Sequence, residues 1–575
     1  MSPDHDVVVV GAGGDGPVAA WRLAEAGLDV LVLEAGPWHG NENWPNPHAS
    51  PGNAKTSSSP DDLSGALLDE QFTKRTLDMG PFVGKFRWGP ADRSRPRWPR
   101  KPPQDGDIFQ VAGVGGTTLH YLGNHPRAFP AAIDEQGHWP IDYADLVPYY
   151  QTNERLLDVG PAPTTPKEDL FFQGAEARDW PLLDVKNVTE AGYRPQPNAI
   201  RQPSDKLRNE QYDGDFEYPE VTGSTLSGFD MQGNPHPLGA PLEEKAKRSS
   251  NVSYVPMALQ TGNVTIRPNA FVTDVLTESP LGDTPVATGV EFRDTWSGQT
   301  QTVTAEVVCL AAGAIETPRL WLNSGLPDHE WLGRGLTIHW PDAVVGTWDP
   351  DELRERLGQP TLDPHVGQDS AARFDYPGLG SLQIAGLTPG IASVIEYAGS
   401  QAGYAFQNEV DPDEPWDARG RVVGPELKER MADYRRSMIL LILTDDHPHE
   451  HNRVEVSPAQ EDEHGPTPQV FYDASDEDDR KRDELSRIGA EILRGAGASH
   501  VHRVDFPPAP LHIHSTMRIG EVTDAACEAR DVDRLFVTDH SVLGNSLGGP
   551  NPTNTGQALA MRTADKILER YFGDR

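Results

Sequence analysis

Cysteine is scarce in this chain of 575 residues. The two cysteines, Cys309 and Cys527, are far apart, and neither has a CxxC partner. Disulfide scaffolds, structural zinc sites and iron–sulfur clusters need more cysteines than this, so the sequence disfavours all three, and we predict no metal site. The chain also begins without a basic segment, a twin-arginine motif or a cleavage site, so we expect a cytoplasmic protein.

Positive charge and long apolar runs are scarce as well. Lys and Arg together number 50, of which only 12 are Lys, against 87 Asp and Glu residues, so the formal net charge is −37. A surface this acidic repels nucleic acids and anionic lipids, and no apolar run reaches the roughly 18 residues of a membrane-spanning helix. We expect no nucleic-acid partner and no membrane insertion. The acidic, lysine-poor composition is typical of halophilic proteins.

Residues that form a core are plentiful. Hydrophobic residues make up 37% of the chain, and 13 residues are Trp, which is too much core material for a disordered protein. The length exceeds the roughly 250–300 residues at which a single core stops growing. The sequence therefore predicts a folded protein of two or more domains.

The first forty residues have the pattern of a βαβ dinucleotide-binding unit. A β-branched strand at 6–10 leads into a GxGxxG loop, a helical pattern follows, and a second strand at 29–33 ends at Glu34, 18 residues after the last glycine. In such units the glycines let the backbone approach a pyrophosphate, and the acidic residue accepts a hydrogen bond from a ribose hydroxyl. The loop glycines are Gly11, Gly13, Gly14 and Gly16. This motif fits NAD and FAD equally well.

The rest of the chain alternates between irregular and regular patterns. Region 41–107 is rich in Pro and polar residues without clear periodicity, which predicts loops. Region 141–250 is rich in Pro and acidic residues, with little helical periodicity and no clear strand signal. The charge run at 473–484 predicts an exposed helix start, and the histidine-rich segment 447–451 predicts a solvated loop. Further strands are predicted at 264–267, 270–276, 286–292, 302–310, 440–443 and 535–538, and helices at 486–495 and 555–571.

Four separated segments resemble the glucose–methanol–choline (GMC) family of flavin oxidoreductases. They are the βαβ unit, the run Gly-Val-Gly-Gly-Thr-Thr-Leu-His at 113–120, the run Gly-Ala-Ile-Glu-Thr-Pro-Arg at 313–319, and the C-terminal stretch 511–553. The second and fourth segments are similar in form to the branch that contains pyranose 2-oxidase and the gluconate dehydrogenase flavoprotein. The resemblance covers essentially the whole chain and implies FAD rather than NAD.

The resemblance also implies a fold and a domain division. We expect an α/β protein (α+β overall) with a Rossmann-like FAD-binding domain assembled from residues 1–140, 245–341 and 505–575. Residues 141–244 and 342–504 are expected to form a substrate-binding domain with an antiparallel sheet. The residues expected to bind FAD are Gly11, Gly13, Gly14, Gly16, Glu34, Gly115, Gly116, Thr117, Thr118, His120, Val272, Asp539, Pro552 and Thr553.

His120 stands where pyranose 2-oxidase carries its flavin covalently, within a Thr-His-Trp motif. Here the neighbours are Leu119 and Tyr121 instead, so we expect noncovalent FAD, with a covalent link at His120 as the alternative. Leu122 stands where that oxidase has a threonine near the flavin, so a hydroxyl that could contact the flavin is missing. This favours a dehydrogenase that passes electrons to a non-oxygen acceptor over an oxidase that uses O2.

Oxidation of a CH–OH group requires a base for the hydroxyl proton and an acceptor for the hydride, which in this family is flavin N5. Histidine suits the first role because its ordinary pKa is about 6.5. By resemblance, His512 aligns with the catalytic base and Asn551 with its hydrogen-bonding partner. His514 is a rival two residues further on, and it shares a face with His512 if the segment is extended.

The expected substrate is a sugar, sugar acid or polyol, again by resemblance. The alternatives are a GMC-type enzyme for a non-sugar alcohol such as choline, an NAD(P)-dependent Rossmann dehydrogenase, and a flavin-binding module without activity. The last two leave His512 and Asn551 without a role, and we disfavour them for that reason.

Overall fold

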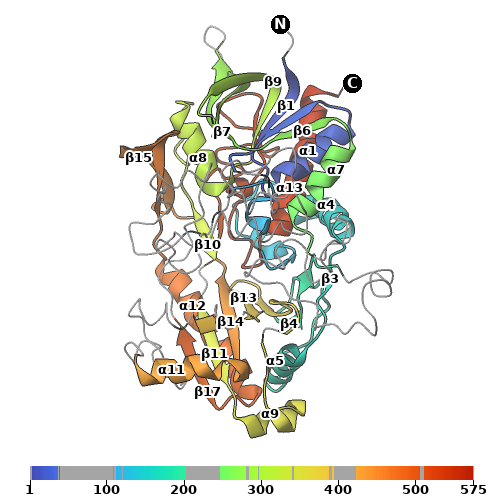
Figure 1. The fold of residues 1–575 in the computed structure, drawn as a ribbon, viewed down its shortest axis with the longest axis vertical. Helices are drawn as coiled ribbons and strands as arrows, with labels where there is room; N and C mark the ends of the chain where they lie inside the picture. The colour runs from blue at the N-terminus through green and yellow to red at the C-terminus, as the bar shows by residue number, and fades with distance from the viewer. Residues whose placement is uncertain are drawn as a thin grey trace, which may run out of the picture.

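The structure is a computed structural model in which two sheets lie one above the other along the long axis (Figure 1). Both chain ends lie near the first sheet, at the top of the view. The described residues are 3–36, 112–119, 121–201, 247–279, 284–295, 297–339, 342–364, 366–386, 423–504 and 511–573, with the single residues 38, 108, 110, 392, 393 and 396.

The first sheet has seven strands gathered from distant parts of the chain. Its order is β6-β2-β1-β9-β8-β7, with β19 paired to β9. β1, β2, β6 and β19 join β9 in a parallel arrangement, whereas β7 and β8 run antiparallel. The strands are β1 (His5–Val10), β2 (Val30–Leu33), β6 (Val264–Arg267), β7 (Ala270–Glu278), β8 (Val286–Asp294), β9 (Thr300–Leu310) and β19 (Leu535–Val537). All the strands predicted here are present. The parallel strands β1 and β2 are continuous apolar runs buried on both faces, whereas the antiparallel strands β7 and β8 alternate between more and less buried residues.

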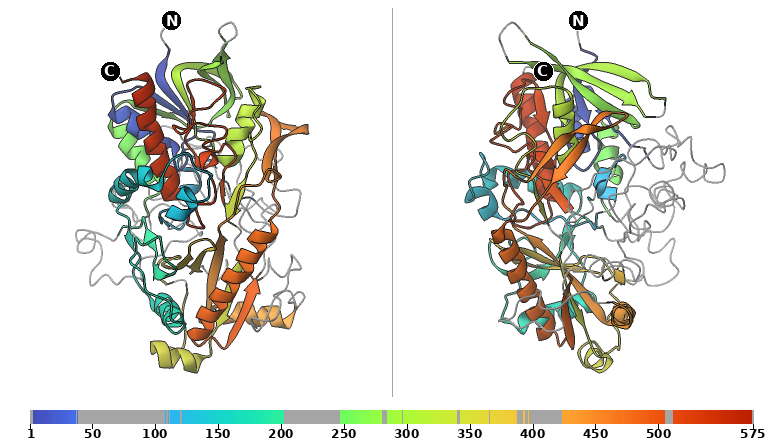
Figure 2. Two further views of the ribbon diagram at one scale, coloured as in Figure 1. Left: turned by 180° about the vertical axis from the view of Figure 1, so that it is seen from behind. Right: turned by 90° about the vertical axis from the view of Figure 1, so that its left-hand side faces the viewer.

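Helices cover this sheet on both faces (Figure 2). On one face, α1 (Gly16–Glu25) packs against α7 (Tyr254–Gln260) and α13 (Thr553–Tyr571). On the other, α8 (Gly313–Asn323) packs against β7 and against a hairpin of β15 (Arg453–Asp462) and β16 (Gly465–Phe471). The predicted helix at 555–571 is confirmed and begins two residues earlier than expected.

In the described part of the region 141–250, the chain forms two helices that the weak helical periodicity of the sequence did not predict. They are α4 (Tyr143–Leu156) and α5 (Pro166–Glu176), and each begins with a capping box, at Asp142 and Thr165. Such a box satisfies free backbone amides at the helix start. Packing then holds α4 in place despite its internal proline, because the helix lies against α13. α4 thus packs with the helices of the first sheet, although the expected domain division assigned its residues to the second domain.

The second sheet is antiparallel and has the order β17-β11-β14-β13-β12-β4. The helix α12 (Asp476–Gly495) packs across it. It begins after the cap Ser475, inside the charge run 473–484 that was predicted to be a helix start, and continues through the predicted helix at 486–495. The predicted strand at 440–443 is the centre of β14. The strands are β4 (Gly192–Pro195), β11 (Ala343–Thr347), β12 (Ala372–Tyr376), β13 (Gly380–Ala385), β14 (Ser437–Thr444) and β17 (His500–Val504).

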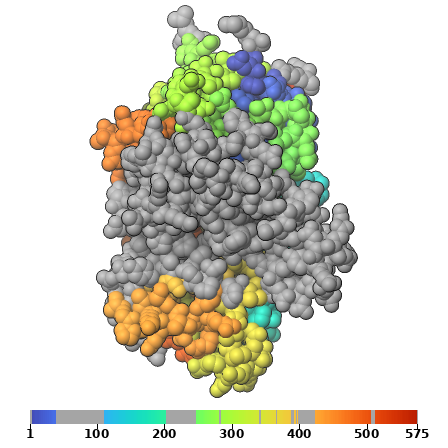
Figure 3. Space-filling view, viewed as in Figure 1, coloured from blue at the N-terminus to red at the C-terminus, as the bar shows by residue number. Residues whose placement is uncertain are grey.

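A short antiparallel pair connects the two sheets. It is formed by β10 (Thr337–His339) and β18 (Leu511–His514), with an irregular register between them. A further pair, β3 (Gly160–Pro161) with β5 (Pro197–Asn198), lies beside the second sheet. The lower end of the molecule shows α9 (Pro350–Leu357) and α11 (Pro425–Ala432) at the surface (Figure 3). Among the described residues, we find no helix with the length and apolar character needed to cross a membrane.

A buried ionic cluster links β4 and β12 in the second sheet. Asp375 accepts hydrogen bonds from Arg194 at 2.8 Å, from Arg373 at 2.6 Å and from Ser381 at 2.8 Å. The side chains of Asp375 and both arginines are at most 1% exposed. Burial alone raises the pKa of Asp375, but the two guanidinium groups outweigh it and hold the pKa below its ordinary value. Asp375 is therefore ionised and neutralises part of the positive charge around it.

We predict that Asp375→Asn destabilises the protein by about 3–5 kcal/mol, because it leaves two guanidinium groups buried without their carboxylate. The matched control is Asp351→Asn, whose carboxylate is 96% exposed and pairs with Arg354 on the surface. That change is expected to cost under about 1 kcal/mol. The measurement is the urea midpoint of both variants. Equal midpoints for the two variants would contradict the role assigned to the cluster.

Candidate active site

A pocket lies at the carboxyl ends of β1 and β2, where α/β sheets bind nucleotides. Its empty volume is about 650 Å³, and it is partly open to solvent. Of the residues predicted from the sequence to bind the cofactor, five line this pocket: Gly11, Gly13, Glu34, Gly116 and Val272.

Two of these glycines let separate segments of the backbone touch. Gly11 has a φ of +113°, and a Cβ there would lie 2.2 Å from the carbonyl oxygen of Ala311. Gly116 has a φ of +51°, and a Cβ there would lie 2.6 Å from the Cα of Gly13. Only glycine fits either position. The bare backbone that results is the surface that a pyrophosphate needs, so the pocket fits the nucleotide half of FAD.

Glu34 connects the segments around the pocket. Its carboxylate accepts hydrogen bonds from the backbone amides of Ala12 at 2.8 Å, Gly36 at 2.8 Å and Gly113 at 2.9 Å. Burial raises the pKa of Glu34, and the three amides oppose that rise. The sequence predicted a ribose contact for this side chain. The structure adds a role that spacing alone did not indicate, which is to hold three loops together.

The segment 112–119 lies against the glycine loop. The amide of Gly115 donates to the carbonyl of Ala12 at 2.7 Å. The hydroxyl of Thr118 donates to the carbonyl of Gly115 at 2.5 Å and accepts from the amide of Ser250 at 3.0 Å. Thr118 therefore holds this segment in place, whereas Thr117 is exposed.

Two other residues predicted to bind the cofactor come from different parts of the structure. Val272 reaches the pocket from β7. Asp539 accepts from the amide of Gly313 at 2.9 Å and from the hydroxyl of Thr317 at 2.6 Å, so it fixes the start of α8. His120 lies outside the described residues.

The start of α13 lies next to the glycine loop. Pro552 precedes the helix, and Thr553 is its first residue and is half-buried. One turn later, the Gln557 amide donates to the carbonyl of Gly14 at 3.2 Å. The helix therefore joins the nucleotide pocket to Asn551, which stands just before it. Positive partial charge at such a helix start favours an anion.

Asn551 and His512 come together from different elements, as the resemblance implied. The Nδ2 atom of Asn551 lies 3.5 Å from Nε2 of His512. His512 lies on β18 with a φ of +51°, a left-handed conformation that is uncommon for this residue type. Burial, with smaller effects of His339 and His540, lowers the pKa of His512 well below 6.5. The imidazole is therefore neutral at neutral pH and able to accept a proton.

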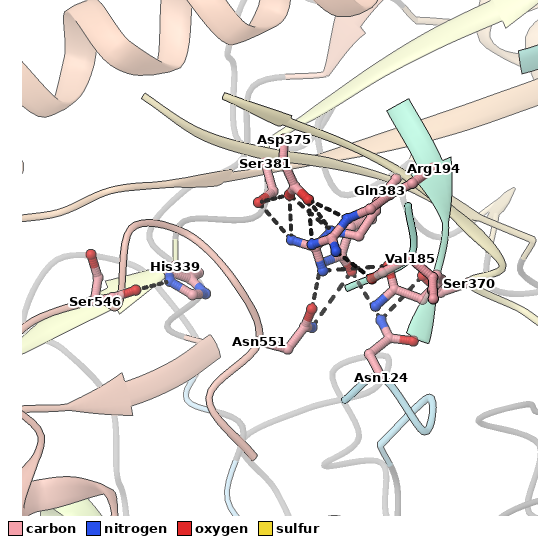
Figure 4. Close-up of polar contacts among 12 residues, drawn as sticks. Asn124, Val185, Arg194, His339, Ser370, Asp375, Ser381, Gln383, Ser546 and Asn551 are labelled. Carbon is pink, nitrogen blue, oxygen red and sulfur yellow. Dashed lines mark hydrogen bonds and ion pairs between the residues drawn. The ribbon is translucent and has the colours of Figure 1, made fainter. Parts of the chain in front are cut away.

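Amide side chains extend the site toward the second sheet (Figure 4). Gln383 of β13 donates to Oδ1 of Asn551 at 2.5 Å, and its own Oε1 accepts from Asn124 at 3.0 Å. Asn124 also donates to the hydroxyl of Ser370 at 3.1 Å. Sequence reasoning missed Gln383 and Asn124, because neither belongs to a motif and only the folded chain brings them together.

The rival histidine, His514, is fully buried beside His339. Its Nδ1 lies 3.4 Å from the hydroxyl of Thr337, across the β10–β18 pair. The rings of His512 and His514 lie 4.9 and 5.3 Å from the ring of His339, measured between centroids. The two histidines thus flank a third one, and His512 is the one that reaches Asn551.

Two further groups lie outside this site. Arg127 forms an internal ion pair with Glu154, with two hydrogen bonds of 2.6 and 2.8 Å. The segment 447–451 is a partly exposed loop between β14 and β15. In the described part of the chain, no group of three or more His, Cys, Asp or Glu side chains is arranged to hold a metal ion.

Comparison with known proteins gives family matches along the chain. Two models described as GMC oxidoreductase match residues 222–341 and 448–560, and one described as FAD binding domain matches residues 6–74. The fold resembles that of pyridoxine 4-oxidase from Mesorbium loti, with a TM-score of 0.59 and 15% identity over 99% of this chain and all of that one.

Curated relatives match over nearly their whole lengths. 6'''-Hydroxyparomomycin C oxidase from Streptomyces lividus is 27% identical over 99% of this chain and 92% of its own. 2-Methyl-1,2-propanediol dehydrogenase from Mycolicibacterium austroafricanum is 25% identical over 98% and 95%. The large subunit of fructose dehydrogenase from Gluconobacter japonicus is 25% identical over 98% and 97%. The chain belongs to the GMC oxidoreductase family, whose members use FAD to oxidise alcohol- and sugar-type substrates.

Proposed function

We propose that the protein oxidises a CH–OH group of a sugar, sugar acid or polyol, with His512 as the general base. The observation that carries this proposal is the 3.5 Å approach of Asn551 Nδ2 to Nε2 of a neutral His512, at the start of the helix that reaches the nucleotide loop. A substrate hydroxyl between these two groups accepts a hydrogen bond from Asn551 and donates one to His512.

The chain's own residues then carry out the proton part of the reaction. Nε2 of His512 takes the hydroxyl proton, and the amide of Asn551 holds the same oxygen so that the reacting C–H bond has one orientation. Gln383 orients that amide through its 2.5 Å hydrogen bond to Oδ1 of Asn551. Bound FAD supplies the hydride acceptor.

Buried amide side chains next to His512 support a substrate with several hydroxyl groups. Asn124, Gln383 and Asn551 present amide donors and acceptors in a row. Two relatives are named for a 1,2-diol and for fructose. A cationic alcohol such as choline is the second candidate, and the nearby cluster disfavours it because Arg194 and Arg373 outnumber Asp375 and leave one positive charge.

The electron acceptor of our proposal is a compound other than O2. The basis is Leu122, which stands where the pyranose 2-oxidase pattern has a hydroxyl-bearing residue near the flavin. The relatives include both an oxidase and dehydrogenases, so their names favour neither acceptor. Noncovalent FAD, held by the glycine loop, Glu34, the segment 115–118, Val272, Asp539 and the start of α13, completes the proposal.

We expect His512→Ala to keep its FAD and to lose activity by about 10²–10⁴-fold, since general bases contribute about that much. The measurement is bleaching of the flavin absorbance by a panel of sugars, sugar acids and polyols without oxygen. His514→Asn is the matched control, because this residue lies on the same strand and Asn preserves a contact with Thr337. Unchanged bleaching in His512→Ala would refute the assignment, and no bleaching of the unmutated protein by any polyol would refute the substrate class.

The acid limb of the pH profile of kcat/KM is expected below pH 6.5. His512 must be neutral to accept a proton, so activity falls as the pH falls through its pKa, and burial lowers that pKa well below 6.5. Activity is therefore retained from neutral pH downward until the imidazole becomes protonated. FAD content is measured at each pH, so that cofactor loss is not mistaken for titration. An acid limb centred at or above pH 6.5 would contradict this expectation.

Glu34→Gln is expected to weaken FAD binding by about 10–100-fold, the effect of roughly 1.5–3 kcal/mol from one lost hydrogen bond to a charged acceptor. The change replaces one acceptor oxygen by an NH2 group that faces backbone amides. The test is the dissociation constant of FAD, from flavin fluorescence. Glu25→Gln, on the exposed side of α1, is the control. Equal affinities in the two variants would argue against the role of Glu34.

A further inference from the structure

We propose that His339 is a positioning residue that sets the tautomer of His512, so that Nε2 of His512 is the bare, proton-accepting nitrogen. This inference rests on the proposed function. Nδ1 of His339 lies 2.8 Å from Nδ1 of His512, and Nε2 of His339 lies 3.0 Å from the carbonyl oxygen of Ser546. His339 is fully buried.

The proton positions follow from the partners. A carbonyl oxygen can only accept, so Nε2 of His339 carries a hydrogen and donates it to Ser546. Burial lowers the pKa of His339 to about 4, with a smaller effect of Arg373, so this imidazole is neutral and its Nδ1 is a bare acceptor. The hydrogen between the two Nδ1 atoms therefore belongs to His512. A neutral His512 that is protonated at Nδ1 has its lone pair on Nε2.

A second set of contacts, which does not involve His339, also reaches Nε2 of His512. Gln383 donates to Oδ1 of Asn551, which turns the NH2 group of Asn551 toward His512. That NH2 group lies 3.5 Å from Oε1 of Gln383 and 3.5 Å from Nε2 of His512, and Nε2 of His512 accepts a hydrogen bond from it only in the tautomer that His339 selects. The two sets of contacts come from different elements, β10 and β13, and both require Nε2 of His512 to be the acceptor.

The backbone holds His339 in position for this task. β10 and β18 are hydrogen-bonded to each other, and the irregular register between them together with the left-handed φ of His512 brings the two rings edge to face. Ser546 lies in the loop that leads to Asn551, and its hydroxyl donates to the carbonyl of Asp446 at 2.8 Å. The side chain of His339 thus contacts both His512 and the loop that carries Asn551.

The main test compares two substitutions of His339. His339→Leu removes the acceptor, and we expect kcat to fall on the order of 10–100-fold with KM and FAD content nearly unchanged, as for other residues that orient a catalytic group. His339→Asn places an oxygen near the former Nδ1, and we expect it to recover most of that loss. His514→Asn, next to the same ring, controls for packing and is expected to keep its kcat.

The tautomer itself is read directly from two-bond ¹H–¹⁵N correlation spectra of the ¹⁵N-histidine holoenzyme at neutral pH. The His512 signals are assigned by their loss in His512→Ala. A proton on Nδ1 of His512 is expected. A proton on Nε2 instead, or an Asn variant no more active than the Leu variant while both retain FAD, would overturn the role of His339. Undiminished activity of His512→Ala would instead overturn the proposed function, so the two failures are distinguishable.

Discussion

The short antiparallel pair of β10 and β18 is the constraint on which the site depends. Along the sequence, β10 follows α8, which lies beside the first sheet, and precedes β11 of the second sheet. Likewise, β18 follows β17 of the second sheet and precedes β19 of the first. The chain passes between the two sheets along both strands, and each strand carries one histidine of the site. Because backbone hydrogen bonds hold the strands together, main-chain geometry sets the distance between His339 and His512, and long flexible side chains are not needed.

The side-chain amides of Asn124, Gln383 and Asn551, here called the amide row, connect the pair of β10 and β18 to the buried interior of the second sheet. Gln383 lies on β13, one strand away from Asp375 on β12, where Ser381 of β13 donates to the same carboxylate. Arg373, which pairs with Asp375, lies directly opposite Gln383 in the register of β12 and β13. The ionic cluster and the amide row therefore belong to one region whose order sets where Asn551 points. In this protein, stability of the second sheet and geometry of the active site are linked.

The parts of the fold that were predictable from the sequence are those with local signals. Continuous apolar runs mark β1, β2 and β9, and motifs mark His512 and Asn551. The capping boxes at Asp142 and Thr165 are also local, yet the surrounding prolines hid them. His339 and Gln383 could not be found this way, because their partners lie 173 and 168 residues away in the chain. His339 meets His512 through the pairing of β10 with β18, and Gln383 meets Asn551 through a side-chain hydrogen bond, and no short pattern in the chain records either contact.

For His512 as the proposed base, the neutral state of its partner His339 has an electrostatic consequence. A carboxylate in the place of His339 would stabilise the imidazolium form and raise the pKa of His512, so that part of the enzyme would be protonated near neutral pH. A neutral imidazole orients His512 equally well without adding negative charge, and burial then keeps the pKa low. The base is therefore fully available but intrinsically weaker. In the proposed reaction, Asn551 and the amides of Gln383 and Asn124 behind it offset that weakness by holding the substrate hydroxyl group in one orientation.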